Sequence, residues 1–375
     1  MKKTIIILAC MLATAMATAQ EHNFTINGTN LPRKIKNGKT IVLCDIQNND
    51  SVGSGIIKKG NFTINGNTDT VFMGYITDRH QLFIPITIEP YMTASIDVRN
   101  YVVGGSPLND QLNRYVHGYM YCKKQRDNAY YFGPKREEER FQDSINAFHE
   151  VSGWQIFNDN ADNVVGAYVL YNLFNGIVNR GDYYSDTVSH RRKMVDSIYA
   201  TSSPVVRNFL LNRQVYEKSQ HQQAVAIGKQ FVDFAGIDRA SHDTVSLSRL
   251  ISGHVAIVDF WASWCGPCRQ EIKQYLKPLY EKYSDSGLVI VGVGVWDNEN
   301  NFDKAINDLE LPYSQLIDLT GKTASSLYGF VSIPQVFLID RNGTMLGKYR
   351  GEELVRETET ALKKQYVPSQ ISSAQ

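Results

Sequence analysis

Two cysteines carry the clearest chemical signal in this chain: Cys265 and Cys268, separated by Gly266 and Pro267. Residues 255–261 before them are apolar and rich in β-branched side chains, as in a buried strand. Residues 269–283 after them have apolar side chains at helical spacing. Cys265 is therefore expected at a strand-to-helix turn, where the helix N-terminus favours thiolate over thiol. The pattern predicts a redox disulfide between Cys265 and Cys268 and the chemistry of thiol-disulfide exchange.

Two cysteines at this spacing can also bind zinc. A structural zinc site normally needs four ligands, but no second Cys-x-x-Cys or His pair follows, and His254 lies at the far end of the expected strand. We therefore expect neither a metal nor an organic cofactor. The formal net charge is only +1, so the composition does not suggest nucleic acid as a partner.

The segment 258–268, Val-Asp-Phe-Trp-Ala-Ser-Trp-Cys-Gly-Pro-Cys, resembles the active-site segment of thioredoxins. It is most similar to that of the exported TlpA- and ResA-type thiol-disulfide oxidoreductases, which are related to the AhpC/TSA group. The resemblance extends over residues 224–368 and implies an α/β thioredoxin fold. The remaining pattern agrees, with an apolar strand at 288–295, helices at 301–309 and 321–328, a hairpin at 335–349 and a helix at 352–365.

The resemblance also assigns roles to other positions. Asp259 matches a buried carboxylate beneath the cysteines, which would take a proton from Cys268. Ile333 and Pro334 match the cis-proline loop, where the Ile333 peptide group would pair with a substrate strand. Glu271 matches a glutamate of the TlpA and ResA group and would modulate the cysteine pair.

Trp264 and Pro267 complete the expected substrate-binding set with Ile333 and Pro334. Two positions depart from the family pattern. Lys273 stands where a helix-kinking proline is usual, with Pro278 five residues later, so the helix is expected to bend elsewhere. Gln335 replaces a threonine that commonly follows the cis-proline.

The N-terminus resembles a secretory signal over residues 1–19. Lys2-Lys3 precede an apolar run, and Ala17-Thr18-Ala19 form a small-residue cleavage site. The alternative, a lipoprotein signal ending before Cys10, leaves an apolar core shorter than the ~7 residues expected of such a signal. We therefore expect cleavage near Ala19 and a location in the periplasm or cell envelope.

Residues 20–104 show short alternating runs separated by Gly and Asn, which predict a small antiparallel β-sandwich. This part resembles a β-rich N-terminal domain of unknown function found before thioredoxin-like domains in exported proteins of Gram-negative bacteria. Residues 105–223 have helical periodicity and many tyrosines, which we interpret as core packing in preference to a peptide-binding surface. Residues 369–375 are expected to form a loose tail. Cys44 and Cys122 could form a disulfide between sheet and helices or remain two buried thiols.

The sequence therefore predicts an exported thiol-disulfide oxidoreductase that mainly reduces disulfides of envelope proteins. Gly266-Pro267 resembles reducing thioredoxin, at ~−270 mV, more than the oxidant DsbA, at ~−120 mV. A reductant in an oxidising compartment must be recharged, so a membrane thiol electron donor is an implied partner. One alternative is a thiol peroxidase, which would need Thr where Ala262 stands. The other alternative is a binding or chaperone module that uses the thioredoxin fold as a scaffold.

Overall fold

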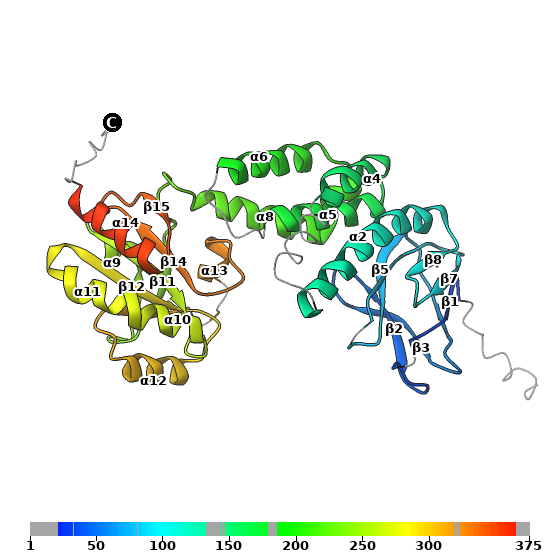
Figure 1. Ribbon diagram of the computed structural model, residues 1–375, viewed down its shortest axis with the longest axis horizontal. Helices are drawn as coiled ribbons and strands as arrows, with labels where there is room; N and C mark the ends of the chain where they lie inside the picture. Colours follow the sequence, from blue (N-terminus) through cyan, green and yellow to red (C-terminus); the bar gives the residue numbers. More distant parts are fainter. Residues whose placement is uncertain are drawn as a thin grey trace, which may run out of the picture. The chain divides into compact units, whose positions relative to one another are not determined.

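The computed structural model describes residues 22–364 except 33, 81, 133–143, 145–146, 179–185, 319 and 321–322. The expected signal segment, Cys10, the basic and acidic run 135–140 and the tail 369–375 lie outside these residues. The chain divides into two compact units, Met1–Asn175 with Tyr199–Arg213, and Gly176–Ile198 with Gln214–Gln375 (Figure 1). In the described part of the chain, no helix is long and apolar enough to cross a membrane.

The N-terminal unit contains two four-stranded sheets, as the alternating runs predict. One has the order β4-β1-β7-β8 and the other β3-β2-β5-β6. Their inward side chains, among them Ile26, Leu43 and Ile86, form one buried core. All pairs are antiparallel except β1 with β7, which is parallel. The strands are β1 (Phe24–Thr29), β2 (Thr40–Asp45), β3 (Ser51–Ile56), β4 (Phe62–Gly66), β5 (Phe72–Thr77), β6 (Ile84–Ile88), β7 (Thr93–Asp97) and β8 (Val102–Gly104).

The repeated sequence Asn-Phe-Thr-Ile-Asn-Gly, at 23–28 and 61–66, supplies two neighbouring strands. β1 and β4 pair antiparallel with Ile26 opposite Ile64, and both isoleucines are fully buried. The threonine and asparagine positions are opposite each other on the outer face, where Thr25 donates a hydrogen bond to Asn65 at 3.0 Å. The repeat is therefore a self-complementary strand pair.

Helix α2 (Pro107–Phe132) is fixed to both sheets by the side-chain amides of Asn109, which is buried, and Asn113, which is half-buried. The Asn109 side chain accepts from the N–H of Thr87 and donates to its carbonyl, at 2.9 and 3.1 Å. The Asn113 side chain makes the same pair of bonds with the backbone of Val103 in β8. The remaining helices of this unit are α4 (Trp154–Asp159), most of α5 (Val164–Val178), and α7 (Pro204–Asn208).

Cys44 is a buried free cysteine, so the possible disulfide between Cys44 and Cys122 is not formed. The helical residues 105–223 are divided between the two units, because α6 (Asp186–Thr201) and α8 (Leu210–Ala224) each cross a boundary between them.

The C-terminal unit is built on a seven-stranded sheet with the order β10-β9-β13-β12-β11-β14-β15. β11 runs parallel to β12 and antiparallel to β14. Val255, Ile257 and Trp261 of β11 belong to one buried cluster, and Ala256, Val258 and Phe260 to another. Both faces of the sheet are therefore covered, which explains the continuous apolar run. The strands are β9 (Ala235–Asp238), β10 (Thr244–Ser246), β11 (Val255–Trp261), β12 (Leu288–Gly294), β13 (Ser314–Ile317), β14 (Gln335–Ile339) and β15 (Met345–Lys348).

The helix after the cysteines is interrupted around Lys273, where the sequence departs from the pattern of the family that it resembles. α10 (Gly266–Glu271) continues through a π-helical turn, η2 (Ile272–Leu276), into α11 (Lys277–Tyr283). Pro278 has no N–H to bond the preceding turn, and the widened turn lies directly before it. The other helices of the unit are α9 (Leu247–Ile251), α12 (Glu299–Leu309), α13 (Thr323–Leu327) and α14 (Gly351–Lys363).

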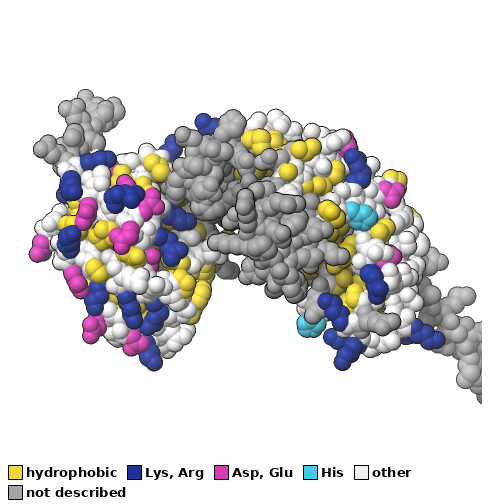
Figure 2. Space-filling model, in the orientation of Figure 1, with side chains coloured by type: hydrophobic (Ala, Val, Ile, Leu, Met, Phe, Trp, Pro, Cys, Tyr) yellow, Lys and Arg dark blue, Asp and Glu magenta, His cyan; other side chains and the backbone are white. Residues whose placement is uncertain are grey.

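On the face shown in Figure 2, acidic and basic side chains of this unit are interspersed.

Candidate active site

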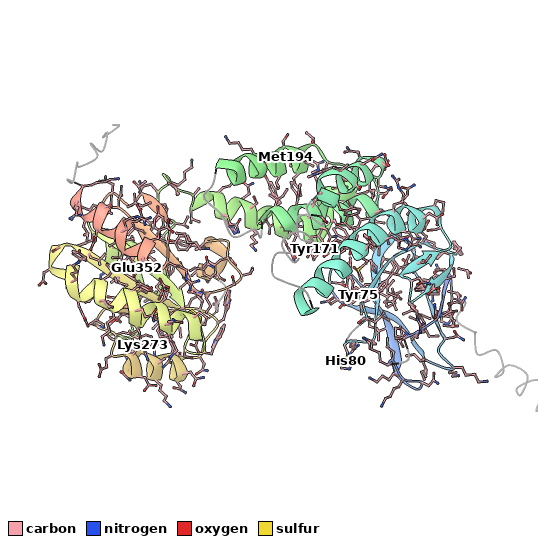
Figure 3. The ribbon with its side chains drawn as sticks, viewed as in Figure 1. Tyr75, His80, Tyr171, Met194, Lys273 and Glu352 are labelled. Atoms are coloured by element: carbon pink, nitrogen blue, oxygen red, sulfur yellow. A yellow bond between two sulfur atoms is a disulfide. The ribbon has the colours of Figure 1, made fainter. Side chains whose placement is uncertain are left out.

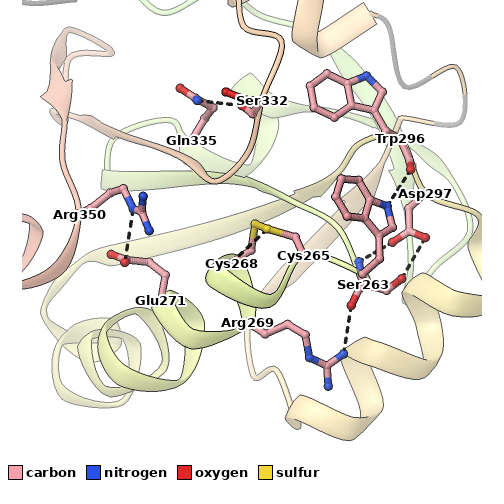
Figure 4. Close-up of a disulfide and its surroundings, with 11 residues drawn as sticks. Ser263, Cys265, Cys268, Arg269, Glu271, Trp296, Asp297, Ser332, Gln335 and Arg350 are labelled. Carbon is pink, nitrogen blue, oxygen red and sulfur yellow. Dashed lines mark hydrogen bonds and ion pairs between the residues drawn. A yellow bond between two sulfur atoms is a disulfide. The ribbon is translucent and has the colours of Figure 1, made fainter. Parts of the chain in front are cut away.

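Cys265 lies where the sequence places it, directly after β11 and at the N-cap of α10. Its sulfur accepts a hydrogen bond from the Cys268 N–H at 3.2 Å, so the first turn of the helix donates to it. The two cysteines form a disulfide with their Cα atoms 5.3 Å apart (Figure 4). Cys265 retains 4% exposure while Cys268 has none. Pro267 is exposed in the first turn, where no N–H is required. Of the two sulfurs, that of Cys265 is the one an outside disulfide can reach.

The loop before Cys265 is held by Asp297. The Ser263 N–H and hydroxyl both donate to the Asp297 carboxylate, the hydroxyl at 3.0 Å. Arg269, one turn into the helix, donates to the Ser263 carbonyl at 3.3 Å. These bonds connect the end of β11, the loop after β12 and the start of the helix, and so fix the direction of the Cys265 side chain (Figure 4).

Exposed apolar side chains are found next to this loop. Trp264 is 61% exposed, and its ring N–H donates to the Trp296 carbonyl at 3.0 Å. The Trp296 ring contacts Phe330 at 5.8 Å between centroids, and the adjacent Val331 is 69% exposed. Trp296 also has a positive φ of 55°, which is strained for a bulky residue. Strain and exposed apolar area of this kind are typical of binding surfaces.

Asp259 is fully buried on the cysteine face of the sheet. It occupies an odd position in β11, like Ile257 and Trp261, whose side chains pack in the same cluster as both cysteines. Among the described residues, neither carboxylate oxygen has a hydrogen-bond partner. Burial raises the pKa of Asp259 well above its ordinary value, the nearby Glu271 raises this pKa further, and Arg350 opposes the shift. Asp259 therefore keeps its proton to a higher pH than an exposed aspartate does, which suits an acid-base partner of a thiol.

Glu271 connects the active-site helix to α14. Its carboxylate accepts from the Gly351 N–H at 2.6 Å and lies 3.6 Å from the Arg350 guanidinium. Glu271 is buried, but Arg350 is half-exposed (Figure 4). A buried charge is tolerated when it is paired and hydrogen-bonded. The carboxylate of Glu271 is the negative charge that raises the pKa of Asp259, and the guanidinium of Arg350 is the positive charge that opposes this shift.

A tyrosine also lies close enough to interact electrostatically with Asp259. The Tyr313 hydroxyl is buried and has no hydrogen-bond partner among the described residues. Burial raises the pKa of Tyr313 and the charge of Asp259 raises it further. Tyr313 therefore stays protonated.

The loop before β14 carries the expected proline. The Ile333–Pro334 peptide bond is cis. Pro334 is buried, whereas Ile333 is half-buried and packs against the cluster that contains both cysteines. The Gln335 side chain donates to the Ser332 carbonyl at 2.8 Å (Figure 4). Gln335, which departs from the family pattern, therefore stabilises the cis-proline loop through a hydrogen bond within it.

All eight residues that the sequence nominated lie in the C-terminal unit, around the Cys265–Cys268 disulfide. The sequence analysis did not identify Trp296, Asp297 and Arg350. Trp296 and Asp297 directly follow β12, at the same sheet edge as Cys265, and the adjacency of parallel strand ends could have found them. Arg350 is distant in sequence and had no such signal. In the described part of the chain, no group of three or more metal-ligating side chains is present.

Comparisons with known proteins find thiol-disulfide oxidoreductases among the relatives of this chain. The AhpC/TSA family model matches residues 227–347, and a domain of unknown function, DUF4369, matches residues 24–112. The chain is 32% identical to the thiol-disulfide oxidoreductase ResA of Geobacillus thermodenitrificans over 32% of this chain and 67% of that protein. It is 30% identical to the thiol:disulfide interchange protein DsbE of Vibrio cholerae over 35% of this chain and 68% of that protein.

Similar solved structures include the thioredoxin domain of a thiol-disulfide oxidoreductase from Bacteroides vulgatus. Its identity is 30%, with 36% of this chain and 96% of that one covered and a TM-score of 0.33. A second solved structure, of a putative thiol:disulfide interchange protein DsbE from Chlorobium tepidum, is 33% identical over 36% of this chain and 97% of that one, with a TM-score of 0.33.

The fold and the cysteine pair define a thioredoxin-like enzyme with an added N-terminal DUF4369 domain. The chain belongs to the family of thiol-disulfide oxidoreductases that includes ResA and DsbE.

Proposed function

We propose that this oxidoreductase acts in the cell envelope, mainly as a reductant of disulfides in other envelope proteins. The observation that carries the proposal is the placement of Cys265. Its sulfur lies at a helix N-terminus, is the more exposed of the pair, and is adjacent to an exposed apolar surface. The partner sulfur and a carboxyl with raised pKa lie buried behind it.

The chemistry proceeds in two displacements. The Cys265 thiolate attacks a substrate disulfide, forming a mixed disulfide and releasing the first substrate thiolate. Cys268 then loses its proton to the Asp259 carboxylate and attacks the Cys265 sulfur, which releases the second substrate thiolate. Two electrons pass to the substrate, and the Cys265–Cys268 disulfide is the oxidised product. A thiol donor must reduce this disulfide before the next cycle.

Features of the sequence support the location and the direction, and the exposed surface beside Cys265 supports the kind of substrate. The N-terminal Lys2-Lys3 and apolar run indicate export. Gly266-Pro267 between the cysteines favours a reducing potential near the ~−270 mV of thioredoxin. The exposed side chains of Trp264 and Val331 suit an unfolded or extended substrate segment, whose backbone would pair at Ile333.

The redox state of the pair in living cells tests this proposal. Host cells would be quenched with acid and fractionated, and Cys265 and Cys268 quantified as alkylated thiols or disulfide by mass spectrometry. We expect the protein in the envelope fraction with the pair mostly reduced. A predominantly oxidised pair would overturn the reductive direction, and recovery from the cytoplasmic fraction would overturn the location.

A further inference from the structure

The N-terminal unit contains a cavity of about 490 Å³ that the redox chemistry does not use. It lies between the sheet β3-β2-β5-β6 and the helices α2 and α5, and every residue that lines it belongs to this one unit. Tyr75 of β5 and Tyr171 of α5 lie on its two sides (Figure 3). The volume falls within the ~300–1,000 Å³ of typical small-ligand sites.

The sheet side of the cavity presents stacked rings and an amide. Tyr75 stacks on Phe83 with ring centroids 4.7 Å apart. The Tyr75 hydroxyl donates to the Asn49 side chain at 2.7 Å, which fixes the orientation of both groups. Phe83 is 47% exposed, so this side of the cavity is open to solvent.

The helix side is formed mainly by tyrosines. Tyr115 of α2 meets Tyr168 of α5 edge-to-face at 6.2 Å, and both are buried. Tyr171, one turn beyond Tyr168, is half-buried and keeps ring area in the cavity. Burial raises the pKa of each of these three tyrosines, so their hydroxyls stay neutral. The interpretation of these tyrosines as core packing therefore holds for Tyr115 and Tyr168 but is incomplete for Tyr171.

Among the described residues, the lining contains aromatic rings, hydroxyls, the amides of Asn49 and Asn172 and five apolar side chains, but no charged side chain. An anionic ligand would find no positive partner there. A purely apolar ligand would cover the exposed Asn49 amide without offering it a hydrogen bond, which is costly. A ligand that suits the lining has polarised C–H groups for ring faces and hydroxyls around its edge.

We propose that this cavity binds an uncharged sugar ring. One face of the sugar lies on the tyrosine rings, and its hydroxyls exchange hydrogen bonds with the tyrosine hydroxyls and the two asparagine amides. The N-terminal unit would then recognise neutral glycan independently of the cysteine pair.

Titration calorimetry of the full chain with cellobiose, maltose and N,N′-diacetylchitobiose tests the proposal. We expect at least one disaccharide to bind saturably. Tyr171→Ala removes a stacking face and should weaken binding about tenfold or more, the equivalent of one modest contact. Tyr121→Ala is the matched control, because Tyr121 is a tyrosine of α2 that is 68% exposed and does not line the cavity. It should bind like the wild type.

Phe83→Ala provides a second test that does not depend on a buried position, because Phe83 is already half-exposed. It should also weaken binding, and neither variant should change insulin reduction. Absence of saturable binding by all three disaccharides would overturn the proposal, as would binding that both Tyr171→Ala and Phe83→Ala leave intact. Choline is included as a cationic probe of the ring faces. Tyr171-dependent binding of choline without binding of sugars would show a cation site instead.

Discussion

Cys265 and Cys268 differ in what can reach their sulfur atoms. The Cys265 sulfur accepts the N–H of the first helical turn and is slightly exposed, whereas Cys268 is wholly buried. A hydrogen bond and a helix N-terminus both stabilise thiolate. We therefore expect iodoacetamide to alkylate Cys265 before Cys268 in the reduced protein near neutral pH, as peptide mapping would show. Preferential labelling of Cys268 would reverse the assignment of the nucleophile.

Asp259 is the second residue whose role can be tested directly. If its carboxylate accepts the Cys268 proton, Asp259→Asn should slow insulin reduction by up to ~10²-fold. Wild-type turnover should rise with pH as the carboxyl ionises through its raised pKa, and the variant should lose this component. Alkylation of Cys265 should be largely unaffected. Unchanged turnover and an unchanged pH profile would leave Asp259 with a structural role only.

The same variant gives a stability prediction with a definite sign. Because the pKa of Asp259 is raised above 3.8 by folding, the folded protein keeps a proton that the unfolded chain has released. The stability due to the neutral carboxyl is complete below pH 3.8 and is lost as pH rises through the folded-state pKa. Urea unfolding should therefore show Asp259→Asn gaining stability over wild type as the pH increases. A constant difference at all pH values would contradict the shift.

Residue positions were predictable from sequence where local geometry decides them. Strand alternation places Asp259 on the cysteine face, and the three-residue interval places Glu271 beside Cys268. The partner of Glu271 was not predictable, because Arg350 reaches it from another element nearly eighty residues away. The electrostatic interaction of Tyr313 with Asp259, which raises the pKa of Tyr313, was missed for the same reason.

At the scale of elements, the loop after β11 depends on the loop after β12. Asp297→Ala would remove both hydrogen bonds to Ser263 and loosen the segment that aims Cys265. Loss of positioning of this kind costs catalysis more than stability. We expect kcat/KM for insulin reduction to fall by about tenfold, the equivalent of one net hydrogen bond, with a native circular dichroism spectrum.

Asp308→Ala is the control for this variant, because Asp308 is an exposed aspartate of α12, in the element that follows the same loop. It should behave as wild type. Equal activity in Asp297→Ala and Asp308→Ala would show that the Ser263 contacts do not position the nucleophile.

The helix that carries the cysteines shows the limit of element prediction. Its apolar spacing and its beginning at Gly266 follow from the sequence. The place of its interruption does not, because the π-helical turn Ile272–Leu276 includes Lys273, away from which the helix was expected to bend. The form of the interruption depends on how the carbonyls of the turn find other donors. That depends on packing and is not encoded in spacing.

At the scale of the whole molecule, the sequence separates a β-rich part from a thioredoxin-like part. It does not show that the intervening helices divide between two compact units, because contacts between distant segments decide this. The tyrosine cavity was hidden for the same reason: its lining comes from two strands, their loops and several helices. Helical spacing of tyrosines indicates that they are buried. It does not distinguish tyrosines that pack in a solid core from tyrosines that line a cavity.

The central claim is that Cys265 attacks a foreign disulfide and Cys268 resolves the product. Expression of Cys268→Ala in the host should trap substrates as covalent adducts, because no internal thiol can release them. Diagonal electrophoresis would separate these adducts, and mass spectrometry would identify the proteins and the Cys265 linkage. We predict adducts that disappear on reduction and are absent from the Cys265→Ala, Cys268→Ala double variant. Adducts that persist in the double variant, or none in Cys268→Ala while the wild type reduces insulin, would contradict the account.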